Sequence, residues 1–159
     1  MDAFGNFKEK ARSIIDRNRY LVLATSGKDG KPWACPVFFV RDNDYNFYFM
    51  SATDSRHVKN IRDNENVAVV VFDSNVEVGN SDEVQAEGKA EEVGKSELKR
   101  VIGIYAKKLY PKSPMQPTER YRPEDYSGAS EFKFFKITIG KLYTTGPERR
   151  VEVDLKQDK

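Results

Sequence analysis

The sequence predicts a mainly β, α+β fold, namely an antiparallel β-barrel with flanking helices. About six strand-like segments follow one another with at most one short helix between consecutive strands, which argues against alternating βαβ units. Several of these segments are apolar on both faces, whereas the interior of a barrel takes only one face of each strand. The second face needs helices or another subunit to cover it, and we therefore expect a homodimer.

The composition indicates a single domain over residues 1–159 and argues against several classes of function. The chain has 27 Lys and Arg against 25 Asp and Glu, and a net charge of +2 gives no reason to expect a nucleic-acid partner. It contains no run of about 18 apolar residues and no apolar signal core at the N-terminus. We therefore expect no membrane partner and a cytoplasmic location. One Cys and one His are too few for an internal disulfide or a structural zinc site.

The N-terminal half predicts a helix followed by the core of the barrel. Residues 1–18 form the helix, because apolar residues recur there at helical spacing. The core spans residues 19–93 and begins with a hairpin, whose Asp-Gly turn at 29–30 needs positive φ. Pro36 has no N–H to donate to a strand ladder, so its nitrogen should face an edge, a bulge or a ligand. Gly88 interrupts the alternation of the last core strand, which indicates a bulge or a bend.

The C-terminal half predicts a helix over residues 95–110, a proline-rich loop over 111–130 and closing strands over 131–155. The helix carries one apolar stripe. Several prolines break regular structure in the loop, which is long enough to be a substrate lid or a packed surface crossover. The closing segment divides into strands at 132–138 and 141–145, followed by an edge strand or a tail.

The stretch from 47 to 61 passes from an apolar strand through a polar corner into a short basic helix. Ser55, Arg56, His57 and Lys59 crowd the first turn of that helix, where free N–H groups and the positive end of the helix dipole meet. Cations are unfavourable there for the helix alone, and a bound anion would reverse that effect. The pattern favours a phosphate-binding corner; the alternative is a short helix of mixed charge that simply faces solvent.

An ordered set of short motifs resembles the FMN-binding split-barrel family related to pyridoxamine 5'-phosphate oxidase. The motifs span roughly residues 20 to 93 and follow the order of the family. They are Leu21-Val22-Leu23-Ala24-Thr25, Asp29-Gly30-Lys31-Pro32, Pro36-Val37-Phe38-Phe39, Phe47-Tyr48-Phe49, Ser55-Arg56, Asn60-Ile61, Asn64 before the strand at 67–71, and Val84-Gln85-Ala86-Glu87-Gly88-Lys89-Ala90.

This resemblance implies a six-stranded antiparallel split β-barrel that forms a homodimer and binds FMN at the subunit interface. It assigns the flavin phosphate to Ser55 and Arg56, with Lys59 and Asn60 assisting. His57 stands where the oxidase has a Lys, and would supply a donor or point away. Further expected cofactor contacts come from two strands and from a strand that can reach the flavin of the other subunit; they are Pro36, Val37, Phe38, Phe49, Met50, Ser51 and Gln85.

Other positions depart from the pattern of the oxidase. In the oxidase, an Arg and a Lys on the second strand hold the cofactor. The corresponding positions in this chain are about Cys35 and Val40, so both contacts are missing. The C-terminal substrate segment of the oxidase also has no counterpart in this chain. Pyridoxamine phosphate is therefore not the expected substrate. The resemblance implies an FMN-dependent oxidoreductase acting on a small molecule. The alternatives are an F420-dependent reductase of the same fold, a flavin-binding or electron-transfer protein without dedicated turnover, and a barrel without cofactor.

Overall fold

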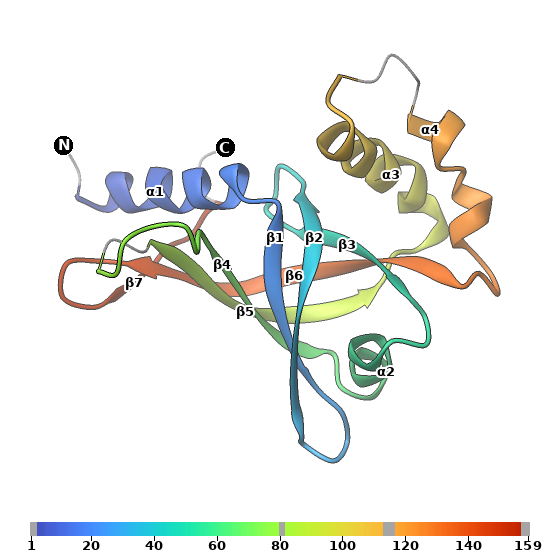
Figure 1. The fold of residues 1–159 in the computed structure, drawn as a ribbon, viewed down its shortest axis with the longest axis horizontal. Helices are drawn as coiled ribbons and strands as arrows, with labels where there is room; N and C mark the ends of the chain where they lie inside the picture. Colours follow the sequence, from blue (N-terminus) through green and yellow to red (C-terminus); the bar gives the residue numbers. More distant parts are fainter. Residues whose placement is uncertain (1–2, 80–81, 113–116, 157–159) are drawn as a thin grey trace.

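A computed structural model describes residues 3–79, 82–112 and 117–156 (Figure 1). Most of the regular elements of the described residues are β-strands, and the helices lie between or beside them along the chain. The elements are α1 (Ala3–Arg17), β1 (Tyr20–Ser26), β2 (Pro32–Arg41), β3 (Phe47–Ala52), α2 (Arg56–Asp63), β4 (Asn66–Phe72), β5 (Glu83–Glu92), α3 (Lys95–Leu109), α4 (Pro117–Arg120), a 3-10 helix η1 (Pro123–Tyr126), β6 (Phe132–Thr145) and β7 (Arg150–Glu152).

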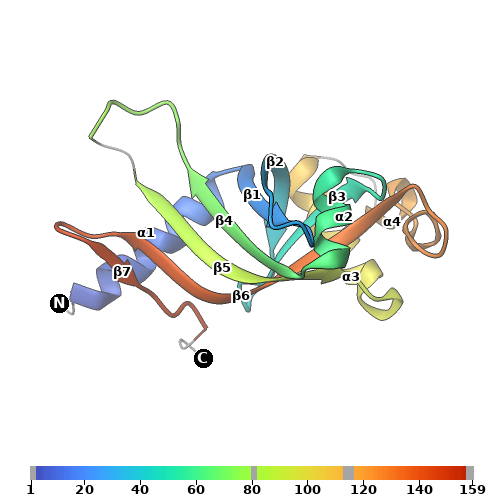
Figure 2. The same ribbon diagram turned by 90° about the horizontal axis from the view of Figure 1, so that it is seen from below.

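The strands form one sheet that closes on itself as an antiparallel barrel. The order across the sheet is β3-β2-β1-β4-β5-β6-β7, and an additional pairing of β3 with β6 closes the ring. β7 adds to the outer edge of β6 and takes no part in the closure. Figure 2 shows β5 and β6 running side by side along the length of the molecule. The predicted six-stranded antiparallel split barrel is thus confirmed.

One apolar cluster fills the barrel, and two helices close its ends. Alternate residues of the strands point inward, as the period of two requires. Phe49, for example, is fully buried and stacks on Phe135 with 5.3 Å between ring centroids. α1 contributes Ile14 and Ile15 to this cluster. α2 contributes Val58 from the region of the polar corner. The helices are therefore held by the burial of their apolar faces.

A second apolar cluster lies outside the barrel, where α3 covers β2, β3 and β6. Tyr48 and Phe134 form the strand side of this cluster, and Val101 and Ile102 form the helix side. The 3-10 helix adds Tyr126, whose ring meets that of Phe134 with 5.0 Å between centroids. α3 thus supplies cover for one part of the outer barrel surface, and its apolar stripe is the one that the sequence predicts.

Two glycine predictions of the barrel core are confirmed. Gly30 has a φ of +68° at the end of the turn between β1 and β2, and its N–H donates to the carbonyl of Gly27 at 3.0 Å. The register between β5 and β6 shifts at Gly88. A Cβ at Gly88 would collide with the backbone carbonyl of Thr138, so only glycine fits this irregularity.

The C-terminal half corrects two expectations. The loop at 111–130 contains α4 and η1, because its prolines occupy helix starts, where a missing N–H costs nothing. Residues 113–116 of that loop lie outside the described residues, as do residues 1 and 2 of the predicted first helix. The strands expected at 132–138 and 141–145 are one continuous strand, β6, which absorbs the register shift opposite Gly88 without ending.

Candidate functional site

The site lies where β2 and β3 separate. The two strands pair only at three positions, Phe39 with Phe49, Val40 with Tyr48, and Arg41 with Phe47. β2 then continues along β1 as far as Pro32, while β3 continues along β6 as far as Ala52. Each of these extensions has a partner on one side only. The barrel is therefore open between them, and α2 begins four residues after β3 ends, beside this opening.

The direction of the backbone bonds shows which groups of β2 and β3 face the opening. The N–H of Phe39 donates to the carbonyl of Arg19, toward β1, and the N–H of Thr53 donates to Glu131, toward β6. Backbone groups alternate along a strand, so those of Phe38 and Met50 point toward the opening. Pro36 has the same orientation as Phe38, so its nitrogen, which has no N–H to donate, lies on the open edge; an edge is one of the three places expected for it.

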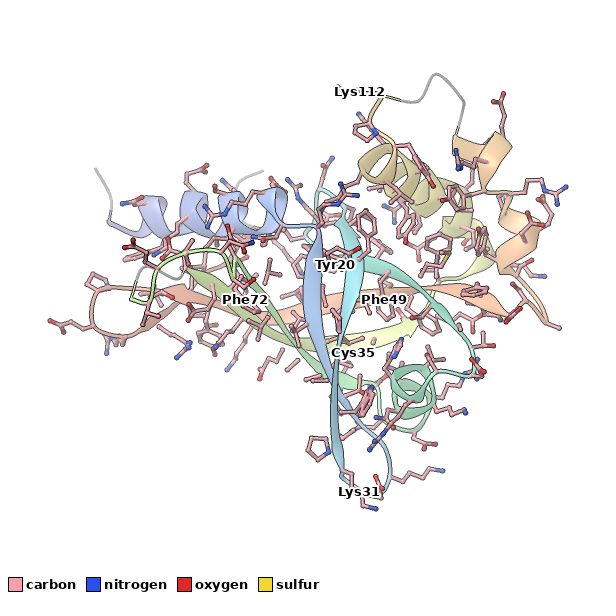
Figure 3. The ribbon with its side chains drawn as sticks, viewed as in Figure 1. Tyr20, Lys31, Cys35, Phe49, Phe72 and Lys112 are labelled. Carbon is pink, nitrogen blue, oxygen red and sulfur yellow. The ribbon has the colours of Figure 1, made fainter. Side chains whose placement is uncertain are left out.

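Val37 and Phe49 turn away from the opening. Both side chains belong to the core of the barrel, and the same alternation directs their N–H groups to β1 and β6. Figure 3 labels Phe49 and also Cys35, a half-buried residue that packs against the same core. Of the expected contacts on these strands, the structure brings the backbone of Phe38, Met50 and Pro36 to the open edge, while the side chains of Phe38 and Met50 pack against the cluster under α3. Val37 and Phe49 lie in the interior.

The N-terminus of α2 has free donors and uncompensated positive charge. Ser55 is the N-cap, but its hydroxyl donates to the carbonyl of Ala52 at 2.8 Å and makes no cap bond to the helix. The first bond within the helix runs from the N–H of Lys59 to the carbonyl of Ser55, so the N–H groups at positions 56–58 precede the ladder. Within residues 3–79, 82–112 and 117–156, neither Arg56 nor Lys59 forms an ion pair. This arrangement can bind an anion.

The guanidinium of Arg56 is held in place by an aromatic ring. It lies 4.5 Å from the ring centroid of Trp33, within the distance of a cation–π contact. Trp33 is itself 39% exposed at the tip of β2. Two segments far apart in sequence thus orient the charge of Arg56 beside the start of α2.

His57 is turned toward β3 and not toward solvent. Its Nε2 lies 2.6 Å from the hydroxyl oxygen of Ser51 and 3.3 Å from that of Ser55. Burial lowers the pKa of His57, so the ring is neutral at neutral pH. A neutral imidazole that shares its Nε2 between two hydroxyls adds no positive charge to the corner. It orders Ser51 and Ser55 beside the N–H groups of α2.

Two asparagines fasten α2 to β1. The amide of Asn60 donates to the hydroxyl of Thr25 at 3.0 Å, and the amide of Asn64 donates to Ser26 at 3.1 Å. Asn60 therefore fixes the orientation of the helix in this protomer. Asn64 has the same function and is not among the predicted site residues. Asn64 is the C-cap of α2 and has an extended backbone, and its place at the end of the helix, four residues after Asn60, is the signal that could have revealed it.

Gln85 lies on a different part of the barrel from the corner. The strand register places Pro36, Val22, Val70 and Gln85 in one row across four neighbouring strands. Three strand spacings separate Pro36 from Gln85, or about 14 Å. Gln85 and the start of α2 therefore do not meet within one protomer.

The fold and the corner together define a class of protein, a split barrel whose opening carries a helix start with free N–H groups and with cations left unpaired within the described residues. The chain belongs to the family described as pyridoxamine 5'-phosphate oxidase, whose model matches residues 7–146. No curated protein sequence matches the chain.

Solved structures share this fold. A heme binding protein from Mycobacterium smegmatis is 19% identical with a TM-score of 0.71; the match covers 93% of this chain and 57% of that one. This chain thus spans little more than half of that protein. General Stress Protein 26 from Bacillus anthracis is 25% identical with a TM-score of 0.59, and the match covers 92% and 98% of the two chains. HutZ, a heme storage protein from Vibrio cholerae, is 18% identical with a TM-score of 0.59 and coverage of 85% and 92%.

The described residues contain no helix that is long and apolar enough to span a membrane. They also contain no group of three His, Cys, Asp or Glu side chains placed to hold a metal ion.

Proposed function

We propose that the protein binds FMN at the opening between β2 and β3 and acts as an oxidoreductase on a small molecule. The observation that carries this proposal is the start of α2, where the N–H groups at positions 56–58 and the charges of Arg56 and Lys59 have no anionic partner among the described residues. A phosphate monoester satisfies all of these groups at once. The membership of the chain in a family named for an oxidase supports the same reading.

The residues around the opening have distinct functions in this proposal. Arg56, oriented by Trp33, binds the phosphate together with the start of α2. The neutral ring of His57 holds the hydroxyls of Ser51 and Ser55 beside the start of α2 without adding charge. The backbone of Phe38 and Met50 faces the polar edge of the ring system. Bound FMN supplies the hydride chemistry, and the protein needs no general base of its own for that step.

We infer that a second copy of the chain completes the site. None of the helices in the described part of the chain covers the outer surface of β1 and β4, where Tyr20 is 58% exposed and Phe72 is 43% exposed (Figure 3). Val22 and Val70 lie on the same surface, between Pro36 and Gln85 in the row across the strands. A homodimer that buries this surface brings Gln85 of one protomer toward the opening of the other.

A charge at the centre of that surface tests the dimer. Val70→Arg should convert the protein to monomers in sedimentation, because it places an unpaired charge in an apolar interface. It should also weaken FMN binding at least tenfold if the partner contributes to the site. Ser96→Arg on α3 is the matched control, and a monomeric Val70→Arg variant with unchanged FMN affinity would contradict the shared site.

The absorbance spectrum of the purified protein tests the cofactor. We expect the two visible bands of a flavin and one FMN per chain, released by denaturation and identified by chromatography. Deazaflavin bands would identify an F420-dependent reductase instead. A protein that is colourless and does not quench the fluorescence of added FMN would refute the proposal.

Heme is the competing cofactor, because two of the similar structures carry it in their names. His57 is the only His of the chain, and its neutral ring is already bonded to Ser51. A Soret band in place of flavin bands would favour heme and would require His57 to leave Ser51. A further assay measures turnover of NADH or NADPH with an electron acceptor. Turnover would indicate an oxidoreductase, and its absence would indicate a flavin protein that only carries electrons. We place the protein in the cytoplasm.

A further inference from the structure

A cavity of about 1000 Å³ lies between α3, the end of α1 and the turn from β2 to β3. Part of its lining is apolar and comes from Val40, Ile104 and Pro111. The cavity lies at the α3 end of the molecule, whereas the α2 corner lies at the other; in Figure 3, Lys112 just after α3 and Lys31 at the hairpin tip near α2 mark these two ends. The cavity is thus separate from the site proposed for FMN.

Charged side chains from four elements and from the β2–β3 turn also line this cavity, and three of its four carboxylates, those of Asp16, Asp42 and Glu97, pair with an arginine. Asp16 accepts two hydrogen bonds from Arg41, both at 2.8 Å. Glu97 pairs with Arg100 at 2.9 Å and with Lys136 at 3.7 Å. These acidic groups are therefore already compensated by the protein itself.

Lys108 and its neighbour Lys107 have no such compensation. Neither forms an ion pair within residues 3–79, 82–112 and 117–156. The ammonium of Lys108 is half-buried, donates to the carbonyl of Asn18 at 2.8 Å and lies 4.2 Å from the ring centroid of Phe39. A second ring, that of Phe38, has its centroid 6.0 Å from the same ammonium. A half-buried cation beside an open cavity, paired with a carbonyl and two aromatic rings but with no carboxylate, favours an anion on its free side.

The charges around Lys108 point in the same direction. Burial lowers the pKa of Lys108 to about 8, Asp16 acts in the opposite direction, and Arg19 and Arg41 lower the pKa further. The positive charges that face Lys108 thus outnumber the single carboxylate. An anion in the cavity would relieve this repulsion and would favour the protonated amine.

We propose that this cavity binds a small organic anion, with its charged oxygens at Lys108 and Lys107 and its apolar part against Val40 and Ile104. The shared chemistry is an oxyanion on an apolar body, which a carboxylate and a phosphate monoester both provide. The combination of an apolar wall with a few cationic groups is typical of small-molecule sites. This proposal does not depend on the identity of the cofactor at the α2 corner.

Binding in this cavity is linked to protonation of Lys108. The groups that face Lys108 are Asp16, Arg19 and Arg41 from the other elements and Lys107 from its own helix. Because Lys108 must be charged to hold the anion, affinity declines as the pH rises through the pKa of about 8. Between pH 7 and pH 9 the charged fraction falls about tenfold, and we expect the association constant to fall by the same factor.

Calorimetry with two probes tests the proposal. Benzoate and phenyl phosphate present the same ring with different anionic groups, and the tighter one identifies the preferred head group. Wild-type protein should bind at least one of them at low ionic strength. Lys108→Met, which keeps the apolar stem, should lose at least tenfold in affinity and most of the pH dependence. Lys99→Met, on the exposed side of the same helix, should bind like the wild type.

The opposite results would overturn the proposal. These are no binding of either probe to the wild type, or equal affinities of the Lys108→Met and Lys99→Met variants. A second measurement uses only the wild-type protein and so does not depend on the folding of a variant. Saturating phenyl phosphate should slow the reductive methylation of Lys108 relative to Lys99, as read by peptide mass spectrometry. Equal rates with and without the probe would place the anion elsewhere.

Discussion

Two arginines at the two ends of β3 have contrasting surroundings. Arg56, beyond the C-terminal end of the strand, stacks on Trp33 and has no carboxylate partner among the described residues. Arg100, near the other end, donates to the hydroxyl of Tyr48 and to Glu97, both at 2.9 Å. Tyr48 in turn donates to Asp42 at 2.8 Å.

The contrast separates a charge that the fold orients without pairing it from one that the fold pairs fully. The network of Arg100 is complete without any other molecule, so its contribution is to hold α3 and the β2–β3 turn on the barrel. Arg56 has orientation without compensation, which is the condition in which an added anion contributes most. Removing Arg56 should therefore affect ligand binding, and disrupting the network of Arg100 should affect stability.

The largest expected effect is on cofactor affinity. Arg56→Ala should weaken FMN binding by about 1.5–3 kcal/mol, the range for a hydrogen bond to a charged group, as measured by flavin fluorescence. Its free energy of unfolding should change by less than about 0.5 kcal/mol, because the side chain is exposed. Arg62→Ala, at the other end of α2, is the control. Equal affinities of the two variants would show that the phosphate binds elsewhere.

The next effect is on stability. Tyr48→Phe should lower the free energy of unfolding by about 1–3 kcal/mol, because it leaves Asp42 and Arg100 without a shared hydroxyl in a buried position. Urea denaturation measures this change, and FMN affinity should remain as in the wild type. Tyr143→Phe removes a hydroxyl for which the described residues show no partner and should be neutral. If Tyr48→Phe left the free energy of unfolding unchanged, the network would orient these side chains without stabilising the fold.

The smallest effect is the pH dependence, which also differs between the two ends. Burial lowers the pKa of His57 in the folded protein below its value in the unfolded chain. As the pH falls below about 6.5, the unfolded chain binds a proton more readily than the folded protein, so the free energy of unfolding declines. Burial alone would raise the pKa of Asp42, but hydrogen bonds from Asn46, Tyr48 and the backbone lower it overall, so its contribution is lost only below about pH 4.

Denaturation at pH 7.5 and pH 5.5 separates the two groups. The wild-type protein should be less stable at the lower pH, and His57→Gln should show a smaller difference. Asp42→Asn should keep the dependence of the wild type in this interval, since Asp42 remains ionised throughout it. A dependence that survives in His57→Gln would assign the titration to another group.

The local chemistry of particular residues explains which parts of the fold could be predicted. The Asp-Gly turn requires positive φ at Gly30, and a bulge forms where a Cβ at Gly88 would collide, so both features follow from residue type alone. The continuity of β6 could not be predicted. Gly140 resembles a break, but the register shift opposite Gly88 lets the strand continue through it.

The candidate site divides in the same way. The residue types at Ser55 and Arg56 indicate an anion site from sequence alone, because helix starts present free N–H groups whatever the fold. Other features of the site could not be predicted. The contact of Arg56 with Trp33 and the bond of Asn64 to Ser26 join segments that are distant in sequence. The contact of His57 with Ser51 depends on side-chain rotamers that packing decides.

The sequence alone therefore determined the antiparallel barrel, its turns and the chemical character of the stretch from 47 to 61, since these depend on periodicity, allowed φ values and helix termini. The tertiary structure decided which of those residues face the opening and which face the core. It also placed Lys108 beside a cavity that no local pattern reveals. The physical reason is that burial and charge compensation are sums over neighbours that the chain brings together only when the barrel closes.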